Sequence, residues 1–338
     1  MADLLTVKDL RVRFKVHGGI VDAVKGASLT IRQGSTVALV GESGSGKSVI
    51  SQCIMGILPE VGQIVGGEIL FTDPQKNGEI IDLAKPAQKS PQMRGIRGGR
   101  ISIIFQEPMT SLSQLHTISD QIGEALHLHR KVSKAEGLRL VEEILRLVGF
   151  PDPNRALRMY PFELSGGLRQ RAMIAMALVC GNPKLLIADE PTTALDVTIQ
   201  AQILDLIKNL VDTTGMSVLL ITHDLRVIAE TATRMAVMYA GSIVESGLVK
   251  DIFTKPLHPY TAGLIKSLAF RGKSGEKNKL FTIQGSVPNL TDLKPGCKFY
   301  DRCNFSKSDI CLGKEPELIK MNTDHEVRCA RTLEINYD

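Results

Sequence analysis

Two adjacent carboxylates near the middle of this 338-residue sequence are placed for hydrolytic chemistry. Asp189 and Glu190 directly follow the apolar run of residues 185–188, which is typical of a buried strand. In α/β sheets, ligands bind at the carboxyl ends of the strands. Asp189 therefore suits a Mg²⁺ shell, directly or through water, and Glu190 suits a base that orients and polarises an attacking water. By itself, the pair is equally consistent with a turn that caps a helix.

A glycine-rich loop earlier in the chain fits a phosphate-binding motif. Residues 41–48 read Gly-Glu-Ser-Gly-Ser-Gly-Lys-Ser, which matches G-x-x-x-x-G-K-[ST]. An apolar strand precedes the loop and a helical pattern follows it, so a chance Gly/Ser turn is a poor explanation. Backbone N–H groups of such a loop wrap phosphate oxygens, and the helix N-terminus adds positive potential. We expect Lys47 to reach the β- and γ-phosphates and Ser48 to bind Mg²⁺. The ATP-binding candidates in this region are Gly41, Ser43, Gly44, Ser45, Gly46, Lys47, Ser48 and Val49.

A second segment resembles an anion-binding helix start. Ser165, Gly166 and Gly167 precede the apolar residues 172–180. Ser165 is a good N-cap, and the glycines would expose backbone N–H groups at the helix N-terminus. The alternative is a capped helix with no ligand.

Taken in order, these motifs resemble the ATP-binding cassette of ABC transporters, over roughly residues 4–250. The resemblance implies a head-to-tail dimer, in which each ATP lies between the phosphate loop of one subunit and the Ser-Gly-Gly segment of the other. One position departs from the family pattern, because Leu168 stands where many cassettes have Gln. Since the phosphate contacts should come from Ser165 and backbone N–H groups, we interpret the half-site as competent.

The resemblance assigns further site residues one at a time. Gln106 matches a glutamine that touches Mg²⁺ or water and senses the membrane subunits. Residues 194–196, ending in Asp196, match a segment at the dimer seam. His223 matches a histidine that contacts the γ-phosphate and holds Glu190 and water in place. Phe14 matches an adenine-stacking aromatic, although the insertion that follows it could displace this role. The implied catalytic residues are Glu190, His223 and Gln106, and the implied Mg²⁺ ligands are Ser48, Gln106 and Asp189.

The elements that must position these residues follow from hydrophobic periodicity. Strands alternating with helices predict an α/β fold with a parallel-sheet core. Apolar strands are expected at residues 36–40, 101–105, 184–188 and 217–222, helical segments at 117–148 and 198–211, N-terminal strands at 5–14 and 27–31, and a hairpin around Gly241. We interpret this as a P-loop NTPase of the ABC cassette type. It would have a RecA-like parallel-sheet core, an N-terminal antiparallel β subdomain and a helical subdomain at about 108–165.

The amino-acid composition of the chain changes after about Phe253. Prolines become frequent, and residues 271–279 form a polar linker rich in Gly and Lys. We expect a nucleotide-binding domain at residues 1–253 and a small Cys-rich C-terminal extension at 254–338, with the boundary between roughly Asp251 and Leu280.

Four cysteines fall in that C-terminal extension, at a spacing of C-x5-C-x7-C-x17-C. Clustered thiolates can bind Zn²⁺ or a [4Fe–4S] cluster, and the lack of C-x2-C pairs lowers the expectation of zinc. Residues 258–260 read His-Pro-Tyr, and the whole tail resembles the ATP-binding subunits of dipeptide/oligopeptide importers, a family with a nickel-importing branch. In that family such a cysteine set is associated with an iron–sulfur cluster, so we expect a structural or sensing [4Fe–4S] cluster, with Zn²⁺ as the alternative and unligated thiols least favoured. The expected ligands are Cys297, Cys303, Cys311 and Cys329.

The composition indicates which classes of partner the protein can bind. The net charge is only +5, tryptophan is absent and aromatic residues make up 4%, which argues against a surface that stacks nucleic-acid bases. No run is apolar enough to span a bilayer, and the start of the sequence has no secretory signal pattern. We therefore expect a peripheral protein at the cytoplasmic face of the inner membrane, with no nucleic-acid partner.

The resemblance implies an ATPase that powers import of di- or oligopeptides by ATP-dependent dimer closure. Its partners would be two membrane permease subunits, a second and non-identical ABC ATPase and, indirectly, an extracytoplasmic peptide-binding protein. The alternatives are the same motor role for nickel or another small solute, and a soluble ABC ATPase that acts on nucleic acid or ribosomes. An iron–sulfur redox enzyme that uses ATP is disfavoured, because the sequence has no flavin or nicotinamide fingerprint.

Overall fold

The computed structural model describes residues 2–106, 111–181, 183–193, 195–269 and 282–337. The chain divides into two compact units, each assembled from three stretches of sequence. The first unit comprises Met1–Leu5, Ile31–Ser35 and Phe71–Ile221, and the second comprises Thr6–Thr30, Thr36–Leu70 and Thr222–Asp338.

Three parallel strands form the sheet of the first unit. They are β6 (Ile101–Ile104), β7 (Leu185–Asp189) and β8 (Ser217–Thr222), with β7 in the middle. Ile101 pairs with Leu185, and Leu185 with Ser217, so the three carboxyl ends lie at one edge. Every residue of β7 is buried, as expected for a parallel strand covered on both faces. The predicted α/β architecture is confirmed, and this edge carries the residues that follow β6 and β7.

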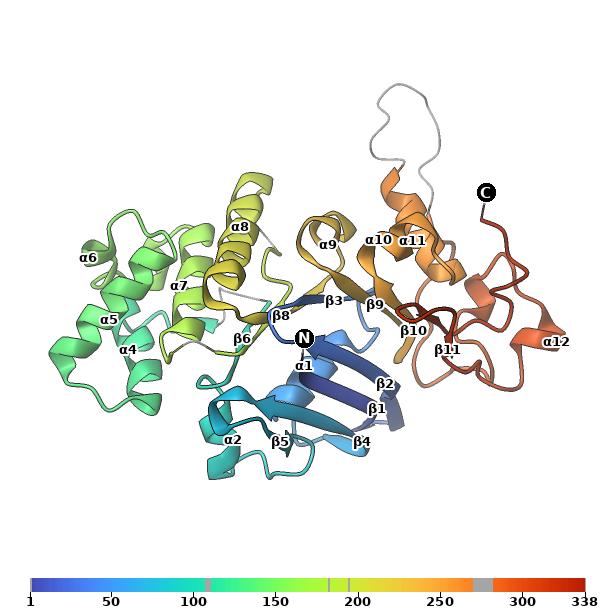
Figure 1. The fold of residues 1–338 in the computed structure, drawn as a ribbon, viewed down its shortest axis with the longest axis horizontal. Coiled ribbons are helices and arrows are strands. Elements are labelled where there is room, and N and C mark those ends of the chain that lie inside the picture. Colours follow the sequence, from blue (N-terminus) through green and yellow to red (C-terminus); the bar gives the residue numbers. More distant parts are fainter. Residues whose placement is uncertain (1, 107–110, 182, 194, 270–281, 338) are drawn as a thin grey trace, which may run out of the picture. The chain divides into compact units, whose positions relative to one another are not determined.

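Helices α4 (Ile118–His129), α5 (Lys134–Leu147) and α7 (Gly166–Leu178) pack on one another in the first unit (Figure 1). The sequence pattern predicted one helical stretch over residues 117–148, but the structure has two helices. Each has its own N-cap, because Thr117 forms a capping box with Asp120, and Ser133 accepts a hydrogen bond from the backbone of Glu136. The other elements of this unit are η1 (Pro74–Lys76), β5 (Glu79–Asp82), α2 (Pro91–Ile96), α6 (Pro153–Ala156), η2 (Pro161–Glu163) and α8 (Val197–Thr214).

The second unit contains a mixed sheet in the order β11-β12-β10-β9-β3. Strand β3 (Thr36–Val40) runs parallel to β9 (Arg234–Tyr239), and β9 forms a hairpin with β10 (Ser242–Leu248). Ala240 and Gly241 both have positive φ in the connecting turn, which is the backbone twist that tight hairpins favour. The short strands β12 (Glu326–Val327) and β11 (Ile319–Lys320) extend this sheet beyond β10. Residues near the end of the chain therefore continue the sheet that begins with β3.

A further sheet in the order β2-β1-β4 belongs mostly to the second unit. Its strands are β1 (Asp3–Val16), β2 (Gly19–Arg32) and β4 (Gly62–Asp73). Strand β2 starts well before the predicted residues 27–31, because the turn at His17 and Gly18 leads directly into it at Gly19.

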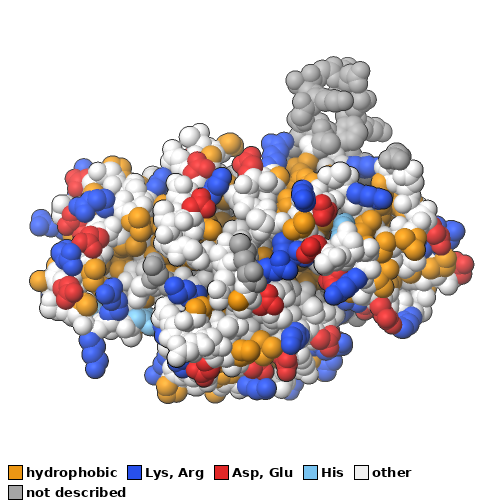
Figure 2. Space-filling model, in the orientation of Figure 1, with side chains coloured by type: hydrophobic (Ala, Val, Ile, Leu, Met, Phe, Trp, Pro, Cys, Tyr) orange, Lys and Arg blue, Asp and Glu red, His pale blue; other side chains and the backbone are white. Residues whose placement is uncertain are grey.

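The helices of the second unit are α1 (Lys47–Met55), α9 (Leu225–Thr231), α10 (Val249–Thr254), α11 (Pro259–Ala269), η4 (Tyr300–Arg302) and α12 (Ser308–Cys311). Tyr260 and Phe299 share one hydrophobic cluster with Ala38, Val237 and Ile228. Residues after position 254 are thus packed into the same core as β3 and β9. Among the described residues, none of the helices has both the length and the apolar character needed to cross a bilayer. Basic and acidic side chains are interspersed on the face that Figure 2 shows.

Candidate functional site

The predicted phosphate loop runs from the end of β3 to the start of α1, and two of its glycines have no room for a side chain. A Cβ on Gly41 would lie 2.2 Å from the carbonyl oxygen of Met238, and one on Gly46 would lie 2.6 Å from that of Ala23. Gly46 also has φ 103° as the N-cap of α1, a conformation that L side chains avoid. At the exposed tip, Gly44 has open space around it. The loop is therefore pressed against β9 at its first glycine and against β2 at its last, and it is open at its tip.

Lys47 lies folded over this loop. Its side chain is buried, and Nζ donates hydrogen bonds to the carbonyl oxygens of Gly41 at 2.8 Å and Glu42 at 3.0 Å. The Ser45 hydroxyl is also buried, and it has no hydrogen-bond partner among the described residues. A buried orphan hydroxyl, an ammonium and the N-terminus of a nine-residue helix form a cradle that suits phosphate oxygens. The donor set fits a nucleotide, and Ser43, Ser48 and Val49 belong to the same loop and helix start.

In the first unit, Glu190 directly follows β7 and turns sharply away from it. Asp189 is the last residue of the strand and is buried. Glu190 has φ 49°, which is uncommon for a residue other than glycine, and its N–H bonds the carbonyl oxygen of Ile221 at 2.8 Å. Its Oε2 accepts hydrogen bonds from Gln106 Nε2 at 3.1 Å and from Thr193 Oγ1 at 2.9 Å. The fold thus brings together two predicted residues that are 84 positions apart and fixes one carboxylate oxygen.

Thr193 and the left-handed backbone of Glu190 were not foreseen from the sequence. Local pattern carries no signal for either, although the Pro191-Thr-Thr segment suggested a turn.

Ser165 and the two glycines after it open α7 on the first unit. The Ser165 hydroxyl accepts a hydrogen bond from Leu168 N at 3.4 Å, and Ser165 and Gly166 are exposed. A Cβ on Gly167 would lie 2.7 Å from Cγ2 of Ile199 in α8. The second glycine is therefore required where the two helices meet, while the exposed start of α7 offers backbone N–H groups to a ligand.

The other predicted site residues, Asp196, His223 and Phe14, lie on three different elements or at their ends. Asp196 caps α8 by accepting a hydrogen bond from Ile199 N at 3.0 Å, and Ala194 lies outside the described residues. His223 directly follows the last residue of β8. It belongs to the second unit, and its side chain is exposed. The Phe14 ring, on β1, lies close against Gly62 of β4.

The expectation of a metal centre at the four C-terminal cysteines is wrong. Within the described part of the chain, which includes all four, no group of three or more His, Cys, Asp or Glu residues could hold a metal ion. The thiols instead line a small, largely apolar cavity of about 20 Å³. Burial raises the pKa of Cys297, Cys303 and Cys329 to about 11, so these groups are neutral thiols. Neither a [4Fe–4S] cluster nor Zn²⁺ is therefore assigned to this protein.

Comparison with known proteins supplies two independent matches. The sequence profile described as ABC transporter matches residues 24–193, and the profile described as Oligopeptide/dipeptide transporter, C-terminal region matches residues 244–311. The dipeptide transport ATP-binding protein DppD of Bacillus subtilis is 48% identical, over 97% of this chain and 95% of its own length. The oligopeptide transport ATP-binding protein OppD of the same organism is also 48% identical, over 96% of this chain and 88% of its own.

A solved structure shows the same fold. An ATP-binding cassette, determined as a dimer in a post-hydrolysis state bound to ADP and Pi, superimposes with a TM-score of 0.62. The two chains are 27% identical, and the superposition covers 73% of this chain and 99% of that one.

Proposed function

This chain belongs to the ABC transporter family and has its cassette fold, and on that premise we propose that it powers the import of di- or oligopeptides. It is an ATPase whose hydrolysis of ATP to ADP and phosphate is coupled to transport. The peptide cargo is supported by the match of residues 244–311 to the oligopeptide/dipeptide transporter C-terminal region. It is also supported by the names of the Bacillus subtilis relatives, which are 48% identical over nearly the whole chain.

The second unit supplies the phosphate-binding residues in this proposal. The loop from Gly41 to Gly46 and the N-terminus of α1 wrap the phosphates, and Lys47 moves its ammonium from loop carbonyls to phosphate oxygens. Ser48 would bind Mg²⁺, and His223 would contact the γ-phosphate. Phe14 is the proposed adenine-stacking residue. Mg²⁺ neutralises charge on the phosphates when it is bound.

The first unit supplies the hydrolytic residues. Glu190 acts as the base that orients and polarises water, while Asp189 and Gln106 serve the Mg²⁺ shell. The hydrogen bonds from Gln106 and Thr193 fix the position of one carboxylate oxygen of this base, Oε2. Ser165, Gly166 and Gly167, together with Asp196, would face the ATP that a second ATPase subunit binds.

The wider assembly follows from the same family membership. We infer two membrane permease subunits, a second ABC ATPase that is a non-identical homologue, and an extracytoplasmic peptide-binding protein that acts indirectly. The chain would then work at the cytoplasmic face of the inner membrane. We place the nucleotide-binding domain at residues 1–253, with a helical subdomain at about 108–165, and the importer-specific extension at 254–338. The segment 270–281 of that extension and residues 107–110 lie outside the described residues.

The observation that carries the hydrolytic part of this proposal is the Glu190 carboxylate held by Gln106 and Thr193 at the end of a buried strand. Glu190→Gln should lower steady-state ATP hydrolysis by about 100-fold or more, because removal of a general base typically costs that factor. ATP binding should remain, since the phosphate loop is unchanged. Hydrolysis is measured as phosphate release by the assembled transporter, and binding by titration calorimetry.

The matched control is Glu143→Gln, which removes an exposed carboxylate paired with Arg139 on the surface of α5. Its turnover should equal that of the wild type, because exposed ion pairs contribute little. Undiminished turnover in Glu190→Gln would remove Glu190 from the proposed role.

A further inference from the structure

Glu42, the second residue of the phosphate loop, is paired with a residue 260 positions further along the chain. Arg302 Nη1 donates to Glu42 Oε2 at 2.6 Å, and Nη2 donates to Oε1 at 3.0 Å. Two parallel hydrogen bonds of this kind fix both the distance and the orientation of the partners. Both residues belong to the second unit, so the contact lies within one compact body. The residues after position 282 thus reach the loop directly.

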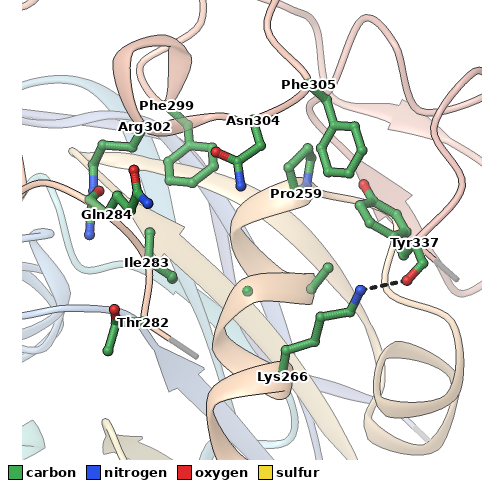
Figure 3. A pocket seen from close by; sticks show the side chains of 12 residues that line it. Pro259, Lys266, Thr282, Ile283, Gln284, Phe299, Arg302, Asn304, Phe305 and Tyr337 are labelled. Carbon is green, nitrogen blue, oxygen red and sulfur yellow. Dashed lines mark hydrogen bonds between the residues drawn. The ribbon is translucent and has the colours of Figure 1, made fainter. Parts of the chain in front are cut away.

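The Arg302 guanidinium is itself held from several sides. Only 6% of its side chain is exposed, and Nε donates to the carbonyl oxygen of Gln284 at 2.9 Å. Its Cζ atom lies 5.7 Å from the ring centroid of Tyr239 and 5.9 Å from that of Phe299. Figure 3 shows Arg302 beside Phe299 and Gln284, at the rim of a pocket of about 130 Å³. The hydrogen bond to Glu42 raises the pKa of Arg302, so its charge is permanent.

Tyr260 holds the backbone of the same loop residue. The Glu42 N–H donates to the Tyr260 hydroxyl at 3.0 Å. The Tyr260 ring is fully buried, and its centroid lies 4.7 Å from that of Tyr239 and 5.4 Å from that of Phe299. Burial raises the pKa of Tyr260, so the phenol remains neutral. The side chain and the N–H group of Glu42 are therefore both fixed by residues that follow position 254.

The carbonyl group of Glu42 transmits this constraint to the loop. It accepts hydrogen bonds from Lys47 Nζ at 3.0 Å and from Ser45 N at 3.2 Å. Glu42 is thus fixed on its N–H and carboxylate sides by the C-terminal residues, while its carbonyl oxygen orients the lysine and the loop backbone. A loop that is already ordered before it binds a ligand avoids the entropic cost of ordering on binding.

We propose that Arg302 and Tyr260 are positioning residues for the phosphate loop, and that through Glu42 the C-terminal segment sets the affinity of this chain for MgATP. The inference rests on the proposed function, because it takes the loop as the nucleotide site. It assigns to the residues after position 254 an effect on nucleotide binding, in addition to any effect on cargo or assembly.

Arg302→Met is the principal test, with MgATP titrated calorimetrically into the full-length chain. We expect the dissociation constant to rise about tenfold, because the variant leaves a partly buried carboxylate without its partner. Glu42→Gln should weaken binding in the same direction. The double variant should bind no more weakly than Arg302→Met alone, since Arg302 acts through Glu42 and the two effects are then not additive.

Tyr260→Phe keeps the aromatic core and removes only the hydroxyl that accepts from Glu42 N. It should weaken MgATP binding severalfold without unfolding the unit, and it keeps the proposal testable if Arg302→Met does not fold. The matched control is Arg234→Met. Arg234 Nη1 bonds Asp324 Oδ1 at 2.5 Å, so it also joins the sheet to the C-terminal residues, but it does not contact the loop.

The outcomes separate the two proposals. Weaker binding in Arg302→Met and Tyr260→Phe, with unchanged binding in Arg234→Met, supports positioning of the loop. Unchanged binding in Arg302→Met or Tyr260→Phe overturns it, as does an equal loss in Arg234→Met, which would mean general loosening of the C-terminal segment. A wild-type chain that binds no MgATP would instead overturn the proposed nucleotide site, and this inference with it.

Discussion

Glu190 combines chemical and conformational demands at one position. Its positive φ is of the kind that costs about 1–3 kcal/mol for a residue with a side chain. The hydrogen bond from its N–H to Ile221 and those from Gln106 and Thr193 to its carboxylate hold it in that conformation. Residues held in such strained conformations cluster at active sites, which is consistent with the role proposed for this carboxylate.

Gly46 combines a positive φ with a close approach to the backbone of β2. Gly46→Ala should abolish measurable MgATP binding and lower the melting temperature, because its Cβ would lie 2.6 Å from the carbonyl oxygen of Ala23. Gly44→Ala is the comparison, since Gly44 also has positive φ but open space around it. We expect Gly44→Ala to lower thermal stability less. Equal losses of stability in the two variants would show that backbone conformation, and not the close approach to Ala23, decides the effect.

Sequence motifs predict single residues well when their partners are close in the chain. The loop of residues 41–48 was identified with its order and flanking elements, because its glycines, lysine and serine are consecutive. Thr193 and Arg302 were missed, since their contacts with Glu190 and Glu42 depend on the folded backbone. At the four C-terminal cysteines the sequence pattern predicted a site that the structure does not have. The spacing of cysteines cannot show that burial keeps most of them as neutral thiols.

At the scale of elements, the contact between α7 and α8 depends on one small residue. Gly167→Ala should destabilise the protein by about 1–3 kcal/mol, the usual cost of overpacking, because Cγ2 of Ile199 lies 2.7 Å from the new Cβ. Gly166→Ala is the control, since its nearest neighbour, Cδ2 of Leu195, is at 3.5 Å. Chemical denaturation measures both, and Gly167→Ala should cost less stability when it is made in an Ile199→Ala background, which lacks Cγ2. Equal stability of the two alanine variants would contradict tight packing at Gly167.

Element prediction succeeded where hydrophobic runs are long and failed where they are short or interrupted. Strands β3, β7 and β8 lie within a residue of their predicted bounds, because buried parallel strands are almost uniformly apolar. In residues 117–148 the apolar periodicity continues without interruption, so the pattern predicted one helix. The structure has a break there, because Ser133 caps the start of a second helix. Strand β12 has two residues, too few for any period, and it is defined only by its pairing with β10 and β11.

At the scale of the whole molecule, a buried polar cluster joins the C-terminal residues to the sheet. Glu245 is fully buried in β10 and accepts hydrogen bonds from Leu257 N at 2.8 Å, His258 N at 2.9 Å and His325 Nε2 at 2.7 Å. Full burial lowers the pKa of His258 to about 3, and its Nδ1 accepts a hydrogen bond from Tyr260 N at 3.1 Å. His258 is therefore neutral in the folded protein across the physiological range.

This histidine makes the stability of the protein depend on pH. Its folded-state pKa lies below the unfolded value of about 6.5, so only the unfolded chain takes up the proton between those values. Stability is unaffected above about pH 6.5 and should fall below it, by up to about 1.4 kcal/mol per pH unit from this residue. His258→Asn keeps an acceptor for Tyr260 and should flatten the slope between pH 6.5 and 5 in urea denaturation. His17→Asn, at an exposed turn, should keep the wild-type slope; identical slopes in all three proteins would contradict the assignment.

In the proposed function, this chain couples ATP hydrolysis to peptide import. The direct measurement is uptake of a labelled peptide into proteoliposomes that hold this chain with its permeases and partner ATPase, supplied with the binding protein and with ATP on the ATPase side. We predict ATP-dependent accumulation with the wild type, none with Glu190→Gln, and wild-type accumulation with Glu143→Gln. Peptide accumulation that persists in Glu190→Gln, or ATP turnover with no peptide uptake in the wild type, would contradict the account.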